Sequence, residues 1–166
     1  MALGVSFDDM WKYLPQWFDA EGIPPGEKHP KEKVFRQIPG MKIPAGWETC
    51  CVQMSYALAR SGHKVSYSNK SRVLRDGFGN EYLLDVAEMR GYLNGFQDAE
   101  KIERPARIPR WLVQAVLSGR KGILAFGGRH IDLWNGSRIH GESYIESALW
   151  EAASTIKNGL FFWELS

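Results

Sequence analysis

The sequence predicts an α+β fold in which helices come first and an antiparallel sheet comes last. Apolar residues recur with helical spacing through most of the first two thirds of the chain. The last third changes to short apolar runs of strand length, and an Asn-Gly pair typical of a hairpin turn lies between two of them. With 166 residues and 44% hydrophobic content the chain can build one packed core, so we expect a single domain over residues 1–166.

The first half of the chain is expected to contain two helices joined by a long loop. Ser6–Phe18 begins with a serine that can cap a helix and has two aspartates in the first turn. Gly22–Gly46 is rich in Pro, Gly and Lys and predicts a surface loop. The next helix, Glu48–Gly62, carries an apolar stripe and has Thr49 as its candidate N-cap. This assignment places Cys50 in the first turn.

The middle of the chain predicts one short strand and two further helices. The strand is Lys64–Tyr67, which has an apolar and aromatic pattern. The helices are Glu81–Phe96, with apolar residues at helical spacing, and Pro109–Ser118, which has proline near its first turn and glycine after its end.

The C-terminal third predicts the sheet. Lys121–Gly128 is an apolar run of strand length, and Arg129–Gly141 predicts a hairpin with its turn at Asn135-Gly136. A helix is expected at Glu146–Lys157, and the aromatic run Gly159–Leu165 predicts the last strand.

Charge and composition exclude several classes of function. The net charge is only +2, and the richest basic stretch is broken by two prolines, so we expect no nucleic acid partner. No apolar run approaches the ~18 residues that would span a bilayer, so no integral membrane segment is expected. The N-terminus shows no secretory signal. The two cysteines are adjacent, which excludes a disulfide framework, so either one matters as a thiol.

Cys50 and His130 form the candidate catalytic pair. A helix N-terminus and a neighbouring imidazolium both lower the pKa of a thiol, and Cys50 lies where the first applies. Of the four histidines, His29 and His63 are interpreted as solvent-facing. His130 opens a predicted strand, and a cysteine at a helix start facing such a histidine is the papain-like arrangement.

Two other interpretations apply to the same residues. A free cysteine at the start of an apolar stripe is more often a buried small hydrophobic residue. Two adjacent cysteines and a histidine are too few for a structural zinc site, which usually has four ligands. We therefore expect no metal and no cofactor.

Three segments resemble the fourth family of type VI secretion amidase effectors. WETCCVQMSYALARSG resembles the nucleophile helix of that family, with Cys50 on the nucleophile. RKGILAFGG followed by GRHIDLWNG resembles its strand pair, with His130 on the catalytic histidine, and FFWEL resembles its C-terminal strand. The resemblance spans Thr49 to Leu165 in the same order.

The resemblance implies a papain-like fold of the NlpC-type branch, with the nucleophile helix packed on the sheet. It implies an amidase that cuts between the γ-carboxyl of D-glutamate and meso-diaminopimelate in peptidoglycan stem peptides. Such a protein would be made in the cytoplasm without a signal peptide, delivered by the type VI secretion apparatus, and act in the periplasm of the target bacterium. A cognate immunity protein would be its partner.

The residue that orients His130 is left open among three candidates. The family usually carries an acidic residue on the second hairpin strand, and a two-residue turn would place Gly141 opposite His130. Glu142 is our first candidate, since a bulge at the glycine would bring it into place. His140 is the second. Asp132 is the third, because a solvated strand residue is its ordinary interpretation.

The pair of Cys50 and His130 also leaves the class of reaction open. The same two residues serve a cysteine protease or an acyltransferase acting on a protein substrate. A non-catalytic binding module with a cysteine in its core is the remaining alternative.

Overall fold

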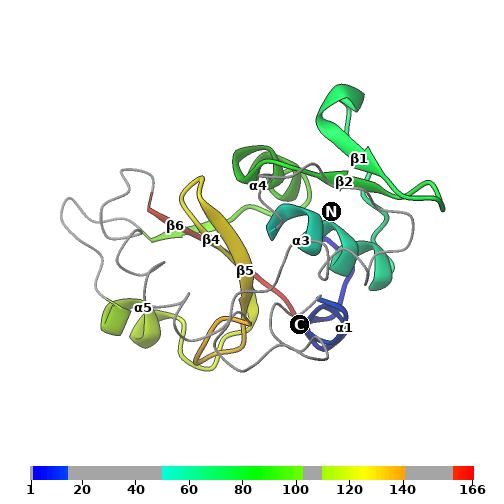
Figure 1. Cartoon of the computed structure of the whole chain (residues 1–166). Coiled ribbons are helices and arrows are strands. Elements are labelled where there is room, and N and C mark those ends of the chain that lie inside the picture. Colours follow the sequence, from blue (N-terminus) through cyan, green and yellow to red (C-terminus); the bar gives the residue numbers. More distant parts are fainter. Residues whose placement is uncertain (1, 15–49, 103–109, 141–158) are drawn as a thin grey trace, which may run out of the picture.

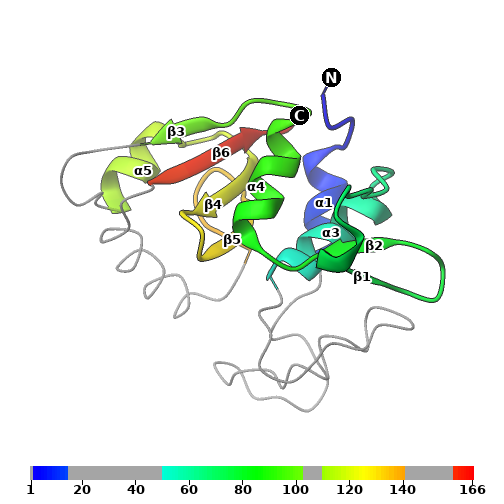
Figure 2. The same ribbon diagram turned by 90° about the horizontal axis from the view of Figure 1, so that it is seen from above.

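The computed structural model describes residues 2–14, 50–102, 110–140 and 159–166. A four-stranded antiparallel sheet forms the middle of the molecule (Figure 1). The helices α1 (Phe7–Tyr13), α3 (Cys50–Arg60) and α4 (Val86–Asn94) pack on one face, and α5 (Arg110–Val116) packs on the other (Figure 2). The predicted α+β class with an antiparallel sheet is confirmed.

The order of strands in the sheet is β3 (Glu100–Ile102), β6 (Leu160–Glu164), β4 (Gly122–Phe126) and β5 (His130–Trp134). Every neighbouring pair is antiparallel. β5 is the end strand among those described, and α3 lies beside it (Figure 1). Cys50 in α3 and His130 in β5 therefore belong to elements in contact.

Alternation along the strands divides the interior into two cores. Ala125 lies opposite both Ile131 and Phe161, and this row packs toward α1, α3 and α4. The alternate residues Leu124 and Phe162 pack toward α5. Both faces of the sheet are thus covered, which explains why residues of β4 are buried on both sides.

The two N-terminal helices form for the local reasons that the sequence indicates. The Ser6 hydroxyl accepts a hydrogen bond from the Asp9 backbone N–H at 3.1 Å and caps α1. Residues at helical spacing in α3 are completely buried, among them Met54, Ala57 and Leu58. Gly62 follows α3 with φ of 98°, a conformation that glycine adopts without strain.

The segment predicted as one helix at Glu81–Phe96 is a strand followed by a helix. β1 (Val73–Arg75) pairs with β2 (Glu81–Leu83), and α4 starts only after Asp85, whose carboxylate accepts a hydrogen bond from the Glu88 N–H. The prediction was wrong because apolar spacing in so short a run fits either period, and the cap at Asp85 decides where the helix begins.

Two further strand assignments differ from the prediction. Lys64–Tyr67 is not a strand, although Val65 is buried against the core, so its apolar pattern reflects a packed connection. Glu100–Ile102 was not predicted at all. It forms β3 by pairing with β6, a long-range contact that three residues of sequence do not indicate.

The hairpin after β5 has a different register from the one predicted. Trp134 pairs with Ile139, and the Asn135 N–H donates to the Arg138 carbonyl. The Asn135 side chain accepts hydrogen bonds from the backbone N–H groups that follow it, which produces a wider turn than the two-residue one expected. The pairing of His130 with Gly141 depended on the tighter turn, so its basis is lost.

Several predictions lie outside the described residues. These are the loop Gly22–Gly46, the capping role of Thr49, the helix Glu146–Lys157 and the position of Glu142. Within the ranges that the structure describes, no helix has both the length and the apolar character needed to cross a membrane.

Candidate active site

Cys50 is the first residue of α3, and its side chain lies at the junction of that helix with β5. The residue is 4% exposed. Its sulfur forms hydrogen bonds with the His130 side chain and with the Ile131 backbone at the start of β5. The first N–H groups of a helix have no partner within the helix, so they face the same region as the sulfur. The predicted contact between Cys50 and His130 is therefore present in the structure.

The electrostatic surroundings of Cys50 favour its ionised form. The hydrogen bond from the Cys51 side chain lowers the pKa of the Cys50 thiol most, while burial raises it. The hydrogen bond and the positive charge of His130 lower it further, and the net result is a pKa well below the usual value for a thiol. The hydrogen bond from Cys51 and the adjacent imidazolium thus outweigh the cost of burying the charge.

His130 carries the complementary charge. Burial lowers the pKa of its imidazole, but hydrogen bonds to the Asp132 carboxylate and to Cys50, together with the charges of both groups, raise that pKa overall. A raised pKa on the imidazole and a lowered pKa on the thiol describe a thiolate–imidazolium pair. The charge on each group therefore favours the charged form of the other.

Asp132 is the residue that contacts the second side of the His130 ring. Its Oδ2 atom lies 3.2 Å from His130 Nε2, and its Oδ1 atom accepts the Leu133 backbone N–H at 2.8 Å. Since Nε2 faces the carboxylate, Nδ1 is the ring nitrogen left to face the sulfur of Cys50. The order of sulfur, imidazole and carboxylate is that of a catalytic triad.

The strand itself explains how two residues on the same face reach each other. His130 and Asp132 are separated by one residue, so both side chains project from the same side of β5. Trp134 projects from that side as well, and its indole N–H donates to the Leu117 carbonyl at 2.9 Å. Val113 of α5 belongs to the same core cluster as Trp134 on this face, and Asp132 is only 6% exposed.

The structure distinguishes the three candidates for the orienting residue. Asp132 is buried, so its interpretation as a solvated strand residue was wrong. His140 Nε2 lies 3.2 Å from the Trp11 carbonyl oxygen, and its ring packs edge-on against the Trp11 ring. Glu142 is not among the described residues. The His-x-Asp spacing on a strand was the sequence signal for the contact with Asp132.

Cys51 has a closer relation to the site than its sequence position suggested. The residue is buried, and its side chain hydrogen-bonds the Cys50 sulfur. Its backbone carbonyl accepts the Ser55 hydroxyl at 2.8 Å, and that hydroxyl in turn accepts the Leu83 N–H at 3.0 Å. This chain of hydrogen bonds joins the first turns of α3 to β2. Neighbouring residues on a helix rarely face each other, so the contact between the two thiols could not be predicted from the sequence.

Arg90 holds the turn that leads into His130. Its guanidinium lies 3.5 Å from the centre of the Phe161 ring, and its Nη1 atom donates to the Gly127 carbonyl at 3.0 Å. The Arg129 N–H closes the same turn on the Phe126 carbonyl at 3.0 Å. The turn between β4 and β5 is thereby attached to α4 and β6. This attachment fixes the position of His130 at the start of β5.

His63 was interpreted as solvent-facing, and the structure corrects this. The ring lies between the N-terminal segment and α4, with Nδ1 at 2.9 Å from the Leu3 carbonyl and Nε2 at 2.8 Å from the Tyr92 hydroxyl. It also packs edge-on against Phe96. These contacts give His63 a structural role. His29 lies outside the described residues.

The described part of the chain holds no group of three or more His, Cys, Asp or Glu residues arranged to bind a metal ion. The side chains of the site offer a thiolate that can act as nucleophile, an imidazolium that can act as acid and a carboxylate that holds the imidazole.

Comparisons with known proteins identify a family for this chain. Residues 47–163 match the family described as type VI secretion system (T6SS), amidase effector protein 4. No curated protein matches the chain.

Solved structures resemble the whole fold. The type VI effector Tae4 from Enterobacter cloacae is 22% identical, with 98% of this chain and 97% of that chain covered and a TM-score of 0.67. The same effector in complex with Tai4 is 21% identical, covers 98% and 99%, and has a TM-score of 0.69. Tae4 from Salmonella typhimurium, also solved with Tai4, is 22% identical, covers 98% and 99%, and has a TM-score of 0.59.

Proposed function

The chain belongs to the amidase effectors of family 4 of the type VI secretion system, antibacterial enzymes that degrade peptidoglycan, and we propose that it cleaves between D-glutamate and meso-diaminopimelate. The bond is the amide formed by the γ-carboxyl of D-glutamate in the stem peptide. The observation that carries the proposal is the contact of Cys50, at the start of α3, with His130, whose other side faces Asp132.

The first half of the reaction transfers the glutamyl group to the enzyme. The Cys50 thiolate attacks the γ-carbonyl carbon and forms a carbon–sulfur bond. The His130 imidazolium donates its proton to the nitrogen of diaminopimelate as the carbon–nitrogen bond breaks. A thioester on Cys50 and a free amine on diaminopimelate result, and His130 is left neutral.

The second half releases the other product. Neutral His130 takes a proton from a water molecule, and the resulting hydroxide attacks the thioester carbon. The carbon–sulfur bond breaks and restores the thiolate beside the imidazolium, while D-glutamate leaves with a free γ-carboxyl group that loses its proton to the solvent. Overall, one water molecule is consumed for each amide cleaved.

The start of α3 stabilises the negative oxygen that forms in both halves. We propose that the backbone N–H of Cys50, at the described start of α3, donates to this oxygen, since the dipole is positive at a helix N-terminus. A carbonyl carbon bonded to the Cys50 sulfur has its oxygen within reach of that N–H, so the oxyanion receives a hydrogen bond where charge develops.

Asp132 is the positioning residue for His130. Its carboxylate holds Nε2 of the ring at 3.2 Å, which keeps Nδ1 directed at the sulfur and stabilises the positive charge. The bond from the Leu133 N–H fixes the carboxylate in turn. We propose Asp132 for this role ahead of Glu142 and His140, the first and second candidates from the sequence.

Delivery and partners follow from the family. The related structures include effector–immunity complexes with Tai4, and an immunity protein of that kind is the expected partner of this chain. As a type VI effector that acts on peptidoglycan, the protein is secreted. We propose that it is made in the cytoplasm and acts in the periplasm of the target bacterium.

Mass analysis of fragments released from purified sacculi tests the proposed bond. The wild-type chain is expected to release fragments with a free diaminopimelate amine and a free γ-carboxyl on D-glutamate, while Cys50→Ala releases none. Cleavage at any other bond, or release that persists in the Cys50→Ala chain, contradicts the proposal. A protease or acyltransferase would leave the sacculi unchanged and act on a protein substrate instead.

A further inference from the structure

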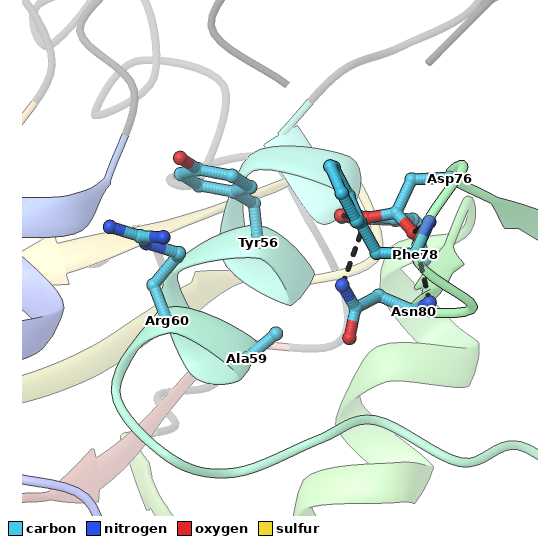
Figure 3. Close-up of a pocket in the computed structure, with 7 residues that line it drawn as sticks. Tyr56, Ala59, Arg60, Asp76, Phe78 and Asn80 are labelled. Atoms are coloured by element: carbon cyan, nitrogen blue, oxygen red, sulfur yellow. Dashed lines mark hydrogen bonds between the residues drawn. The ribbon is translucent and has the colours of Figure 1, made fainter. Parts of the chain in front are cut away.

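A hollow lies on α3, away from Cys50. It has a volume of about 420 Å³ and is formed by the outer side of the helix and the turn between β1 and β2 (Figure 3). Its lining residues are Tyr56, Ala59, Arg60, Asp76, Phe78, Asn80 and Tyr82.

The turn on one side of the hollow is fixed by a single carboxylate. Asp76 accepts hydrogen bonds from the backbone N–H groups of Phe78 at 2.8 Å and Asn80 at 3.0 Å. It also accepts the Asn80 side-chain amide at 2.9 Å and the Tyr82 hydroxyl at 2.5 Å. Four bonds to one carboxylate leave the turn little freedom, so the shape of the hollow exists before any ligand arrives.

This fixed turn holds an aromatic ring in water. Phe78 is 71% exposed, an unusual position for phenylalanine. Across the hollow, the Tyr56 ring forms the facing wall, and Ala59, whose side chain is small, leaves space between them (Figure 3). Two aromatic walls with a shallow floor offer flat apolar faces of the kind that stack on the C–H faces of a sugar ring.

Polar groups at the ends of the hollow add the second half of the chemistry. The Asn80 side chain borders it, and the Arg60 guanidinium stands at the other end, 5.0 Å from the centre of the Tyr13 ring. No carboxylate in the described segments pairs with Arg60. An amide beside flat aromatic faces suits acetamido and hydroxyl groups, and an unpaired guanidinium suits a carboxylate.

The position on α3 relates the hollow to the catalytic pair. Tyr56 and Arg60 follow Cys50 on the same helix, about 9 Å and 15 Å further along its axis at 1.5 Å per residue. The proposed substrate is a polymer in which stem peptides with free carboxylates hang from N-acetylated sugars. A polymer bound with one stem at Cys50 has sugars and neighbouring stems at this distance.

From these features we infer that the hollow of Tyr56, Phe78, Asn80 and Arg60 binds an N-acetylated sugar of the peptidoglycan glycan strand, with Arg60 on a stem-peptide carboxylate. The inference rests on the proposed function, since it takes the same polymer as ligand. It gives the enzyme a hold on the insoluble polymer that the catalytic pair does not supply.

Sedimentation with purified sacculi tests this site in the inactive Cys50→Ala chain, which leaves the polymer intact. Phe78→Ala and Arg60→Gln, each added to that chain, are expected to raise the concentration for half-maximal binding about five- to tenfold. Phe78→Tyr should restore binding. Trp111→Ala is the matched control, because Trp111 is 66% exposed but lies on α5, outside the hollow. Unchanged binding by the first two variants, or equal weakening by the control, overturns the inference.

A second measurement separates this site from the proposed function. Phe78→Ala in the active chain should cleave a soluble stem tetrapeptide without sugars at the wild-type rate, while it degrades sacculi more slowly. Failure of the wild-type chain to cleave the soluble peptide would count against the proposed function alone, because the sedimentation result does not depend on cleavage. Equal losses on both substrates would overturn the sugar site.

Discussion

Burial alone would make Cys50 an ordinary core thiol, and its contacts reverse that outcome. Burial raises the pKa of the thiol, but the Cys51 side chain and the charged His130 ring lower it by more. The same sulfur in the same core without an imidazole would be neutral and inert. The contact with His130, rather than exposure, is therefore what distinguishes a nucleophile from a structural cysteine in this chain.

Replacement of either member of the pair should remove activity without loss of the fold. Cys50→Ala is expected to abolish release of fragments from sacculi, and His130→Ala to lower the rate at least about 10²-fold, the usual contribution of a positioned acid–base group. Cys51→Ala should stay active but shift the rise of the rate to higher pH, since the largest bond that lowers the pKa of Cys50 is lost. Rate–pH profiles of the three variants check this. An inactive Cys51→Ala beside an active Cys50→Ala would reverse our assignment of the nucleophile.

Asp132→Asn should lower kcat about tenfold or more and leave KM nearly unchanged. The amide no longer stabilises the imidazolium that forms during the reaction, and because Asp132 is buried we expect no contact between it and the substrate. Glu142→Gln and His140→Ala are the comparison variants, measured under the same conditions. A silent Asp132→Asn beside a damaging Glu142→Gln would assign the role to the glutamate.

At the residue scale, the sequence indicated two of the three contacting groups. The helix start at Cys50 and the strand start at His130 are local features that composition and spacing reveal. The role proposed for Asp132 depends on its burial, which is a long-range property of the packing. The thiol contact from Cys51 likewise arises from how the first turn of α3 is packed.

At the scale of helices and strands, the Ser55 hydroxyl attaches α3 to β2. It donates to the Cys51 carbonyl and accepts the Leu83 N–H, all of them buried. Ser55→Ala leaves that N–H without a partner, so we expect a loss of about 1–3 kcal/mol in the free energy of unfolding. Urea denaturation measures it, with the exposed Ser66→Ala as control. Equal stability of the two variants would show that the bond contributes nothing.

The centre of the sheet has no room for a side chain at Gly122. A Cβ atom built there would lie 2.1 Å from the Trp163 carbonyl oxygen and 2.9 Å from the Phe162 ring. Gly122→Ala is therefore expected to lower the melting temperature strongly, by the equivalent of about 3 kcal/mol. Gly128→Ala, with no atom within 4 Å of the added carbon, should change it little. Similar melting temperatures for both variants would refute this close approach of β4 and β6.

Element prediction succeeded where local signals were strong and failed where pairing decided the outcome. The cap at Ser6, the buried stripe of α3 and the apolar run of β4 are all visible in the sequence. β1, β2 and β3 have three residues each, and only their partners define them. The register after β5 depended on the hydrogen bonds of Asn135, which widen the turn.

On the scale of the whole molecule, the fold brings together groups that are distant in the chain. Cys50 comes from the helical layer, while His130 and the buried Asp132 come from the end strand among those described in the sheet. The sugar-binding hollow inferred above lies on the outer side of the same helix. Cys50 and His130 come from different layers, so the contact that lowers the pKa of the thiol exists only while these layers are packed together.

The pH dependence of Cys50 alkylation in the folded and the urea-unfolded protein tests this account most directly. Iodoacetamide reacts with the thiolate, and peptide mapping separates labelling of Cys50 from that of Cys51. In the folded protein, half-maximal labelling of Cys50 should fall well below the ordinary thiol value near ~8.5, since its pKa is lowered. In urea it should return to that value, and in folded His130→Ala it should rise. A midpoint that is equal in folded and unfolded protein, or higher in the folded state, would contradict the account.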